Sequence, residues 1–265
     1  MSTSSFSGVR YFFVLEYDGR FFCGWQRQKD QKSVQATFEK ALSQVTGESQ
    51  MSYAAGRTDA GVHACAQVAH VTLSRVYDHD RLKRGTNFYL KASGVVVKRV
   101  IPVSLDMHAR FSACARTYIY IVSNTSYPPV LNDGRVWWVP RPLPAEKIKE
   151  AARFLVGSHD FSAFRASHCQ AKSPFKTLDH VTIDVHNDAF FFTFSARSFL
   201  HNQVRMMVGT LVRVGQKNLP PHHIQRLLQH PDKSMSGPLA PACGLYLTAV
   251  SYDNFTISSN SRMIF

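Results

Sequence analysis

The segment from Gly56 to His63 holds the residues best suited to chemistry. It reads Gly-Arg-Thr-Asp-Ala-Gly-Val-His. Its glycines and the small Ala60 allow a ligand to approach the backbone closely. A cation at Arg57, if it lies near Asp59, would keep that carboxylate ionised below the reference pKa of ~3.9. Such a carboxylate suits nucleophilic or electrostatic work on a developing sugar cation, and it suits general-acid work poorly.

The residue types alone favour a plainer role for Asp59. An aspartate in a glycine-flanked loop is usually a turn former or a cap, because its short side chain bonds the nearby backbone. The string Asp78-His79-Asp80 looks superficially like a metal cluster, and we expect it to be a charged loop. The five cysteines are odd in number, widely spread and without a Cys-x-x-Cys pair. Neither a zinc site nor a disulfide framework is therefore expected.

The composition indicates the kind of partner. The formal net charge is +13 and the pI is near 9.7, which favours a polyanion such as nucleic acid. No apolar run approaches the ~18 residues of a membrane helix, and the first ten residues lack the apolar region of a secretory signal. With the scattered cysteines, these features favour a reducing compartment, the cytoplasm.

The elements that must position these residues follow from hydrophobic periodicity and turn signals. A chain of 265 residues is a soft indication of two domains. Helices are expected from Ser33 to Gly47, from Ala145 to about Val156, from Asn202 to Val214 and near 222–230. Strands are expected at 11–17, 66–73, 94–101, 117–122, 179–186, 189–195 and 244–252. Strand runs with few helices favour an α+β fold with antiparallel sheets, divided near 103–110.

Several ordered blocks resemble the TruA family of pseudouridine synthases. The segment from Gly56 to His63 resembles the active-site motif of that family. Six further blocks recur in the family's order, at residues 17–28, 33–35, 108–112, 116–118, 160–165 and 202–209, and a last one lies at 244–247. So many ordered blocks over residues 10–252 make chance similarity very improbable. The chain departs from the family at Cys23, at Met107 and in the string Asn87-Phe88-Tyr89-Leu90.

The resemblance implies roles for single residues. Asp59 is implied as the nucleophile, Tyr118 as the active-site tyrosine that stacks on the target uracil, and Arg205 as the cation paired with the carboxylate. Arg57 is implied to enter the RNA stack when the uridine is everted, and Leu245 to pack near the target base. The RNA contacts expected with less support are Arg57, His108, Arg110, Phe111, Arg165, His168, Cys169, Gln170 and Lys172.

Competing interpretations stay open for several of these residues. Tyr118 and Tyr120 alternate along one strand, so either could be an ordinary core residue. Arg205 lies in an otherwise apolar helix, where an unpaired charge is costly, so a buried partner is expected over a side chain that reaches the surface. Leu245 could equally be core, Arg57 could serve only as a carboxylate neighbour, and the RNA contacts could all be solvated surface.

The family implies a fold of two ferredoxin-like (RRM-like) halves, residues 1–105 and 106–265, with antiparallel sheets joined around a basic cleft. It implies a homodimer that isomerises uridine to pseudouridine at positions 38, 39 and 40 of tRNA. The reaction oxidises nothing and moves no phosphate, so neither a redox cofactor nor a metal is required. A non-catalytic RNA-binding protein on the same scaffold and a metal-dependent nuclease are the alternatives.

Overall fold

The computed structural model describes residues 8–167 and 169–259, and it divides into two compact units. Unit 1 comprises residues 8–114 together with 247–259, and unit 2 comprises residues 115–246. The described residues contain five α-helices, and their strands pair mostly antiparallel. This is the expected α+β class. No helix in this part of the chain is long and apolar enough to cross a membrane.

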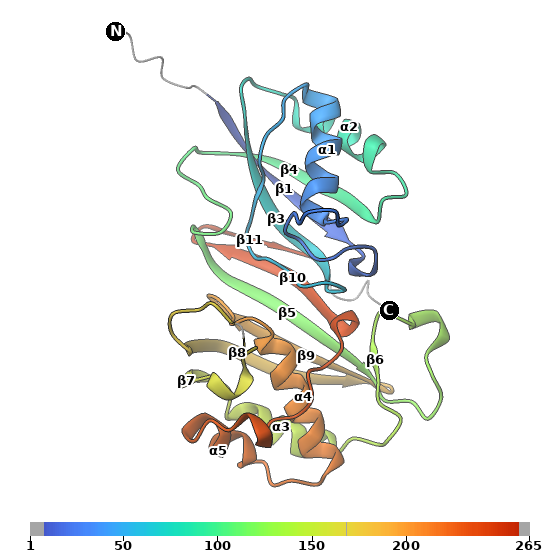
Figure 1. Ribbon diagram of the computed structural model, residues 1–265, viewed down its shortest axis with the longest axis vertical. Coiled ribbons are helices and arrows are strands. Elements are labelled where there is room, and N and C mark those ends of the chain that lie inside the picture. Colours follow the sequence, from blue (N-terminus) through green and yellow to red (C-terminus); the bar gives the residue numbers. More distant parts are fainter. Residues whose placement is uncertain (1–7, 168, 260–265) are drawn as a thin grey trace. The chain divides into compact units, whose positions relative to one another are not determined.

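Unit 1 is built on four neighbouring strands (Figure 1). Their order is β4 (Val95–Val103), β1 (Val9–Tyr17), β3 (His63–Leu73) and β10 (Leu245–Tyr252), the last of which enters this unit at residue 247. The short strands β2 (Tyr53–Ala54) and β11 (Phe255–Ser258) pair with β3 and β10. Phe12 and Phe13 are both fully buried, as expected of a strand covered on both faces.

Two helices pack on the sheet of unit 1 (Figure 1). Helix α1 (Val34–Thr46) begins at Ser33, whose side chain accepts from the N–H of Ala36, and ends at Gly47 in the left-handed conformation, as the sequence predicts. The ring of Phe38 meets that of Phe13 edge to face at 5.0 Å. Helix α2 (His79–Leu90) was not expected, and Asp78 caps it by accepting from the N–H of Arg81. The expected charged loop at 78–80 is therefore a helix start.

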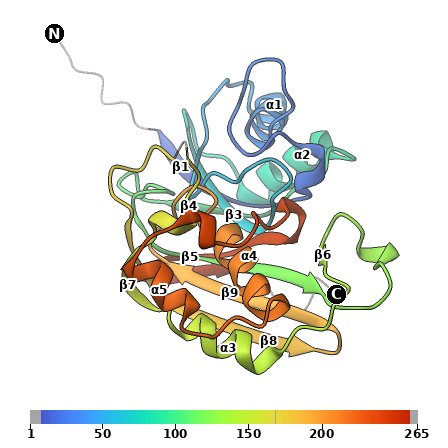
Figure 2. The same ribbon diagram turned by 60° about the horizontal axis from the view of Figure 1, so that its bottom comes forward.

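The strands of unit 2 pair mostly antiparallel. The strand order is β5 (Ala113–Ser123), β9 (Ala189–Ala196), β8 (Phe175–His186) and β7 (Gly157–Asp160), and β6 (Trp137–Trp138) runs parallel to β5. Helix α3 (Ala145–Arg153) contacts β8 and α4 (Gln203–Gln216), and α5 (His223–Gln229) contacts both helices (Figure 2). The predicted hairpin is confirmed, with Asn187 at φ 52° in its turn.

Candidate active site

The loop that carries Asp59 joins β2 to β3 in unit 1. Its backbone is tied to the segment after β1, because the N–H of Trp25 donates to the carbonyl of Thr58 at 3.0 Å. The N–H of Val62 donates to the carbonyl of Asp59 at 3.1 Å and closes the turn. Arg57 is exposed, Thr58 is buried and Asp59 is partly exposed. The loop thus holds a carboxylate within reach of solvent on a fixed backbone.

Several buried side chains form hydrogen bonds with one another and with the backbone of this loop. The Tyr17 hydroxyl and the Thr58 hydroxyl are 2.7 Å apart. Gln67 donates through Nε2 to the carbonyl of Gly56 at 2.7 Å and to the Tyr17 hydroxyl at 3.3 Å. Burial raises the pKa of Tyr17 to about 12, so its hydroxyl stays protonated and keeps these bonds. Tyr17 and Gln67 therefore position the loop, and neither was singled out from the sequence for this role.

Two glycines allow the close backbone approach that the loop needs. Gly24 has φ +116°, and a Cβ built on it would lie 2.7 Å from the carbonyl oxygen of Thr58. A Cβ on Gly19 would lie 2.2 Å from the carbonyl oxygen of Val62, at the other end of the loop. The N–H of Gly19 also donates to Nδ1 of the buried His63 at 3.1 Å. Any side chain at either position would displace the backbone that carries Asp59.

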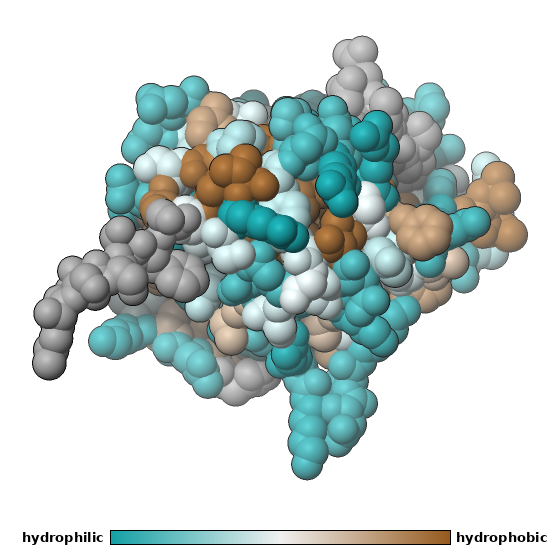
Figure 3. Space-filling view, turned by 90° about the horizontal axis from the view of Figure 1, so that it is seen from above, coloured by the Kyte–Doolittle hydropathy of each residue, from teal (hydrophilic) through white to brown (hydrophobic). Residues whose placement is uncertain are grey.

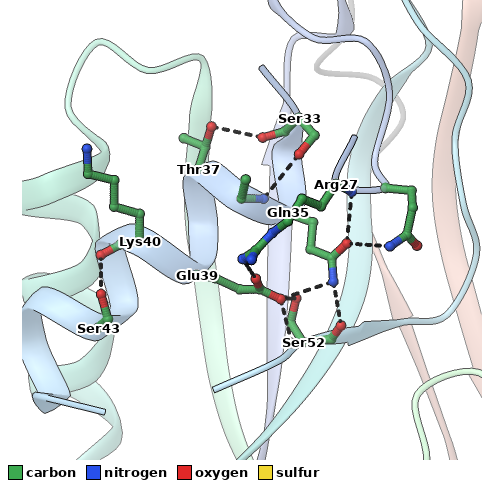
Figure 4. Close-up of polar contacts among 10 residues, drawn as sticks. Arg27, Ser33, Gln35, Thr37, Glu39, Lys40, Ser43 and Ser52 are labelled. Atoms are coloured by element: carbon green, nitrogen blue, oxygen red, sulfur yellow. Dashed lines mark hydrogen bonds and ion pairs between the residues drawn. The ribbon is translucent and has the colours of Figure 1, made fainter. Parts of the chain in front are cut away.

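A second polar network links α1 to the segment after Trp25 and to the residue before β2 (Figure 4). The buried Glu39 of α1 accepts through Oε1 from the N–H of Ser52 at 2.7 Å and from Nε2 of Gln35 at 3.0 Å. Its other oxygen accepts from Arg27, whose side chain is largely exposed. Gln35 also accepts from the N–H of Arg27 at 3.0 Å. The network joins the chain after Trp25 to the residue just before β2.

Tyr118 and Tyr120 lie on β5 in unit 2, and their environments differ. Tyr120 is fully buried and its hydroxyl donates to the carbonyl of Pro241 at 2.7 Å. Burial raises its pKa well above the ordinary value, and the cation of Arg205 opposes that rise. Tyr118 is 8% exposed, and its ring meets Phe199 edge to face at 5.3 Å. Tyr120 is thus an ordinary core residue, while the role of Tyr118 stays a prediction.

Arg205 is held by bonds from its guanidinium within unit 2. Its Nε donates to the carbonyl of Ala240 at 2.8 Å, and its Nη1 donates to Oδ1 of Asn202 at 3.2 Å. Asn202 itself precedes α4 with φ 64°. Leu245 is 6% exposed at the start of β10. Asp59 and Arg57 belong to unit 1, whereas Tyr118, Arg205 and Leu245 belong to unit 2.

The first group of expected RNA contacts forms a cluster in unit 1. The rings of His108 and Phe111 are 4.4 Å apart, and the guanidinium of Arg110 lies 5.5 Å from the centre of the Phe111 ring. The structure adds Tyr53 and His70 to this cluster, and neither was predicted as a member from the sequence. These rings come together only through strand pairing, so no local pattern in the sequence predicts the cluster.

The second group lies between η3 (Ser162–Phe164) and β8 in unit 2. Arg165 and Cys169 are partly exposed, Gln170 and Lys172 are exposed, and His168 lies outside the described residues. The N–H of Cys169 donates to the carbonyl of Ala166 at 3.1 Å. On the face of the molecule shown in Figure 3, hydrophilic residues predominate and apolar residues form small separate groups.

Among residues 8–167 and 169–259, no group of three or more His, Cys, Asp or Glu side chains could hold a metal ion. Asp80, from the string that looked like a metal cluster, forms an ion pair with Lys83 at 3.1 Å. The five cysteines are all free thiols.

Comparisons with known proteins cover most of the chain. The family described as tRNA pseudouridine synthase matches residues 14–112 and 151–253. The tRNA pseudouridine synthase A of Paramagnetospirillum magneticum is 49% identical over 243 residues, which span 92% of this chain and 95% of that protein. The protein of the same name from Maricaulis maris is 47% identical over 243 residues, spanning 92% and 98%. That of Ehrlichia canis is 44% identical over 246 residues, spanning 92% and 100%.

Proposed function

The chain belongs to the tRNA pseudouridine synthase family, and we propose that it isomerises uridine to pseudouridine at positions 38, 39 and 40 of the tRNA anticodon stem-loop. The observation that carries the proposal is the family match across both units, with the Gly56–His63 motif on a firmly held loop. The reaction breaks the N1–C1′ bond, turns the uracil and joins C5 to C1′. The base and sugar both stay in the product, so the atoms balance without any co-substrate.

Asp59 supplies the carboxylate of this chemistry. Charge develops at the anomeric carbon as the N1–C1′ bond breaks, and an anion fixed nearby stabilises that charge or adds to it. The bonds that hold the backbone of Thr58 and Asp59 support this role, because a preorganised group loses no energy in reorienting during the reaction. The partial exposure of Asp59 leaves it accessible to a nucleotide.

Tyr118 and Arg205 of unit 2 act on the same nucleotide. The Tyr118 ring stacks on the everted uracil and its hydroxyl assists proton removal at C5. Arg205 pairs with the catalytic carboxylate. The bonds from Arg205 to Ala240 and Asn202 support a positioned cation, since they fix the plane of its guanidinium.

The remaining site residues bind the RNA. Arg57 enters the stack that the flipped uridine leaves, which offsets part of the few kcal/mol that flipping costs. Its exposure on the Asp59 loop supports this role. Leu245 packs near the target base. Further RNA contacts come from Arg57 and from two groups, His108, Arg110 and Phe111, and Arg165, His168, Cys169, Gln170 and Lys172.

The protein works as a cytoplasmic homodimer of chains with two ferredoxin-like halves, residues 1–105 and 106–265. The antiparallel strands and packed helices within each unit support that architecture, in which residues 247–259 group with the first half rather than the second. The reaction needs no redox cofactor and no metal, since it is neither an oxidation nor a phosphoryl transfer.

One experiment tests the function and the role of Asp59 together. The protein is incubated with unmodified tRNA, and pseudouridine is mapped chemically at each position. The wild-type chain should modify positions 38–40, and Asp59→Asn should abolish product while tRNA binding survives, because asparagine keeps the shape and loses the nucleophile. Product from Asp59→Asn in a tritium-release assay would remove Asp59 from its role. Binding without product in the wild-type chain would identify a non-catalytic RNA-binding protein.

A further inference from the structure

Four aromatic rings form a continuous cluster in unit 1. Tyr53 stacks on His70 with ring centres 5.0 Å apart and planes 17° from parallel. His70 meets His108 edge to face at 4.5 Å, and His108 meets Phe111 at 4.4 Å. We call these four residues the ring cluster. None of them belongs to the Asp59 loop, and the proposed chemistry leaves Tyr53 and His70 without a role.

The backbone explains why these rings meet. Tyr53 and His70 are direct partners in the pairing of β2 with β3. The N–H of Ala109 donates to Nδ1 of His70 at 3.1 Å, which ties the segment of His108 and Phe111 to the sheet. Arg10 of β1 donates through Nη1 to the carbonyl of Met107 at 3.0 Å and holds the same segment. The ring cluster is therefore preformed by bonds from three strands.

The two histidines are held in their neutral form. Nδ1 of His108 accepts from the N–H of Arg110 at 3.0 Å and lies 3.3 Å from the N–H of Phe111. A ring nitrogen that accepts cannot carry a proton, so both imidazoles bear theirs on Nε2. Burial and the charges of His108 and Arg10 lower the pKa of His70 to about 4, and burial with Arg10 and Arg110 lowers that of His108. At neutral pH the cluster offers ring faces, and its positive charge comes from the arginines.

The outer members of the cluster are open to a ligand. Phe111 is 71% exposed and Tyr53 is 48% exposed. Exposed apolar rings that gather into one patch mark an interaction surface, whereas single exposed rings are normal. Arg110 lies over the Phe111 ring at 5.5 Å, so a cation borders the apolar face. A flat, neutral ring attached to an anion fits this combination, and a nucleotide has that chemistry.

We propose that the ring cluster is a stacking site for an unpaired nucleotide of the RNA substrate, with Phe111 and Tyr53 contacting the base and Arg110 the phosphate. The proposal rests on the proposed function and adds a second, sequence-tolerant contact to it. An unpaired base is favoured over a duplex because paired bases hide their faces, and stacking on aromatic side chains is how proteins grip single strands.

The test compares alanine variants at the cluster with a matched control. Phe111→Ala and Tyr53→Ala remove exposed rings from the cluster, and Phe88→Ala removes one that is 74% exposed on α2 of the same unit. The dissociation constant for unmodified tRNA and the single-turnover rate at saturating enzyme are measured for each. Stacking on a base contributes about 1–3 kcal/mol, so Phe111→Ala should weaken binding by about 5- to 150-fold. Phe111→Trp should restore it.

The single-turnover rate separates this proposal from the proposed function. Phe88→Ala should match the wild type in both affinity and rate at saturation, because Phe88 belongs neither to the ring cluster nor to the proposed site. A wild-type chain without product would defeat the proposed function, while the affinities would still test the cluster. Unchanged affinity in both Phe111→Ala and Tyr53→Ala would overturn the stacking site. If those variants instead alter only the sedimentation of the free protein, the cluster is a contact between protein copies and the proposal fails.

Discussion

Two tyrosines on one face of β5 show how much a residue's surroundings decide its role. The Tyr120 hydroxyl is committed to the carbonyl of Pro241, and the side chain is fully buried. Tyr118 retains a small exposed area and packs its ring edge against Phe199. Alternation along the strand places both on the same face, so the pattern alone could not separate them.

This contrast gives a prediction with an internal control. Tyr118→Phe should bind tRNA normally and lose about 10²–10⁴-fold in single-turnover rate, because the ring stays and the proton-transfer group is lost. Tyr118→Ala should be at least as slow and should also bind less tightly. Tyr120→Phe should lose about 1 kcal/mol of unfolding free energy with an unchanged rate. Wild-type rate in Tyr118→Phe would leave the residue only a stacking role, and wild-type rate in Tyr118→Ala would make it an ordinary core residue.

Some residues of the site could be predicted from the sequence, and others could not. Asp59 and Arg57 are contiguous in one motif, and the sequence directs attention to them at once. Tyr17 of β1 and Gln67 of β3 hold the same loop through bonds of 2.7 Å each to Thr58 and Gly56, and Tyr17 lies 41 residues before its partner. Which residues meet across strands depends on register, and register is a property of the folded sheet.

At the scale of the elements, the connection between β1 and α1 controls the position of the Asp59 loop. Gly24→Ala would place a Cβ 2.7 Å from the carbonyl oxygen of Thr58. Gly47→Ala is the matched control, since Gly47 also has a positive φ but a Cβ there meets nothing within 4 Å. Gly24→Ala should lower the single-turnover rate by about 100-fold, as expected for a catalytic group misplaced by ~1 Å.

The control variant should behave differently. Gly47→Ala should lose about 1–2 kcal/mol of unfolding free energy from its left-handed backbone and keep its rate. Urea denaturation and single-turnover kinetics on both proteins decide the matter. Equal loss of rate in the two variants would mean that the close approach at Gly24 does not govern the loop.

The Glu39 network in Figure 4 supports a prediction about stability. Glu39→Gln can keep its amide oxygen toward Ser52 and Gln35, so it loses only the ion pair with the exposed Arg27 and should cost less than ~1 kcal/mol. Glu39→Met leaves the buried N–H of Ser52 without its acceptor and should cost about 2–4 kcal/mol. Urea denaturation measures both. Equal costs would show that the charge of Glu39 matters more than its hydrogen bonds.

Among the elements, α2 was the longest one that was not predicted from the sequence. Its buried residues are Leu82, Thr86 and Leu90, a narrow stripe with a polar member. Gly85 lowers the helical tendency further, yet a Cβ there would lie 3.0 Å from the side chain of Val45 on α1. The residue that weakens the sequence signal thus allows the two helices to pack closely. The longer elements, with stronger periodicity and clear caps, were predicted within a few residues.

At the scale of the whole molecule, the charge predicts how binding responds to salt. A formal charge of +13 on 265 residues favours phosphate contacts. Each phosphate neutralised contributes about −0.9 to the slope of log affinity against log salt in a duplex and about −0.7 in a single strand. Arg110→Gln should reduce the magnitude of the slope by the contribution of one phosphate, about 0.7–0.9. Filter binding or anisotropy between 50 and 200 mM salt measures it, and a flat wild-type slope would contradict an electrostatic RNA surface.

Unit 1 is assembled from both ends of the chain, and this has a consequence for its synthesis. Strand β3 lies between β1 and β10, and β10 is encoded after all of unit 2. At elongation rates of ~5–20 residues per second, the ribosome spends on the order of ten seconds on the intervening residues. Throughout that time the part of the β3 edge that β2 does not cover stays unpaired, and an unpaired strand edge is prone to pairing with a foreign chain. A message truncated before residue 247 would leave that edge open for the life of the product, so C-terminal deletions should yield insoluble protein even when unit 2 is intact.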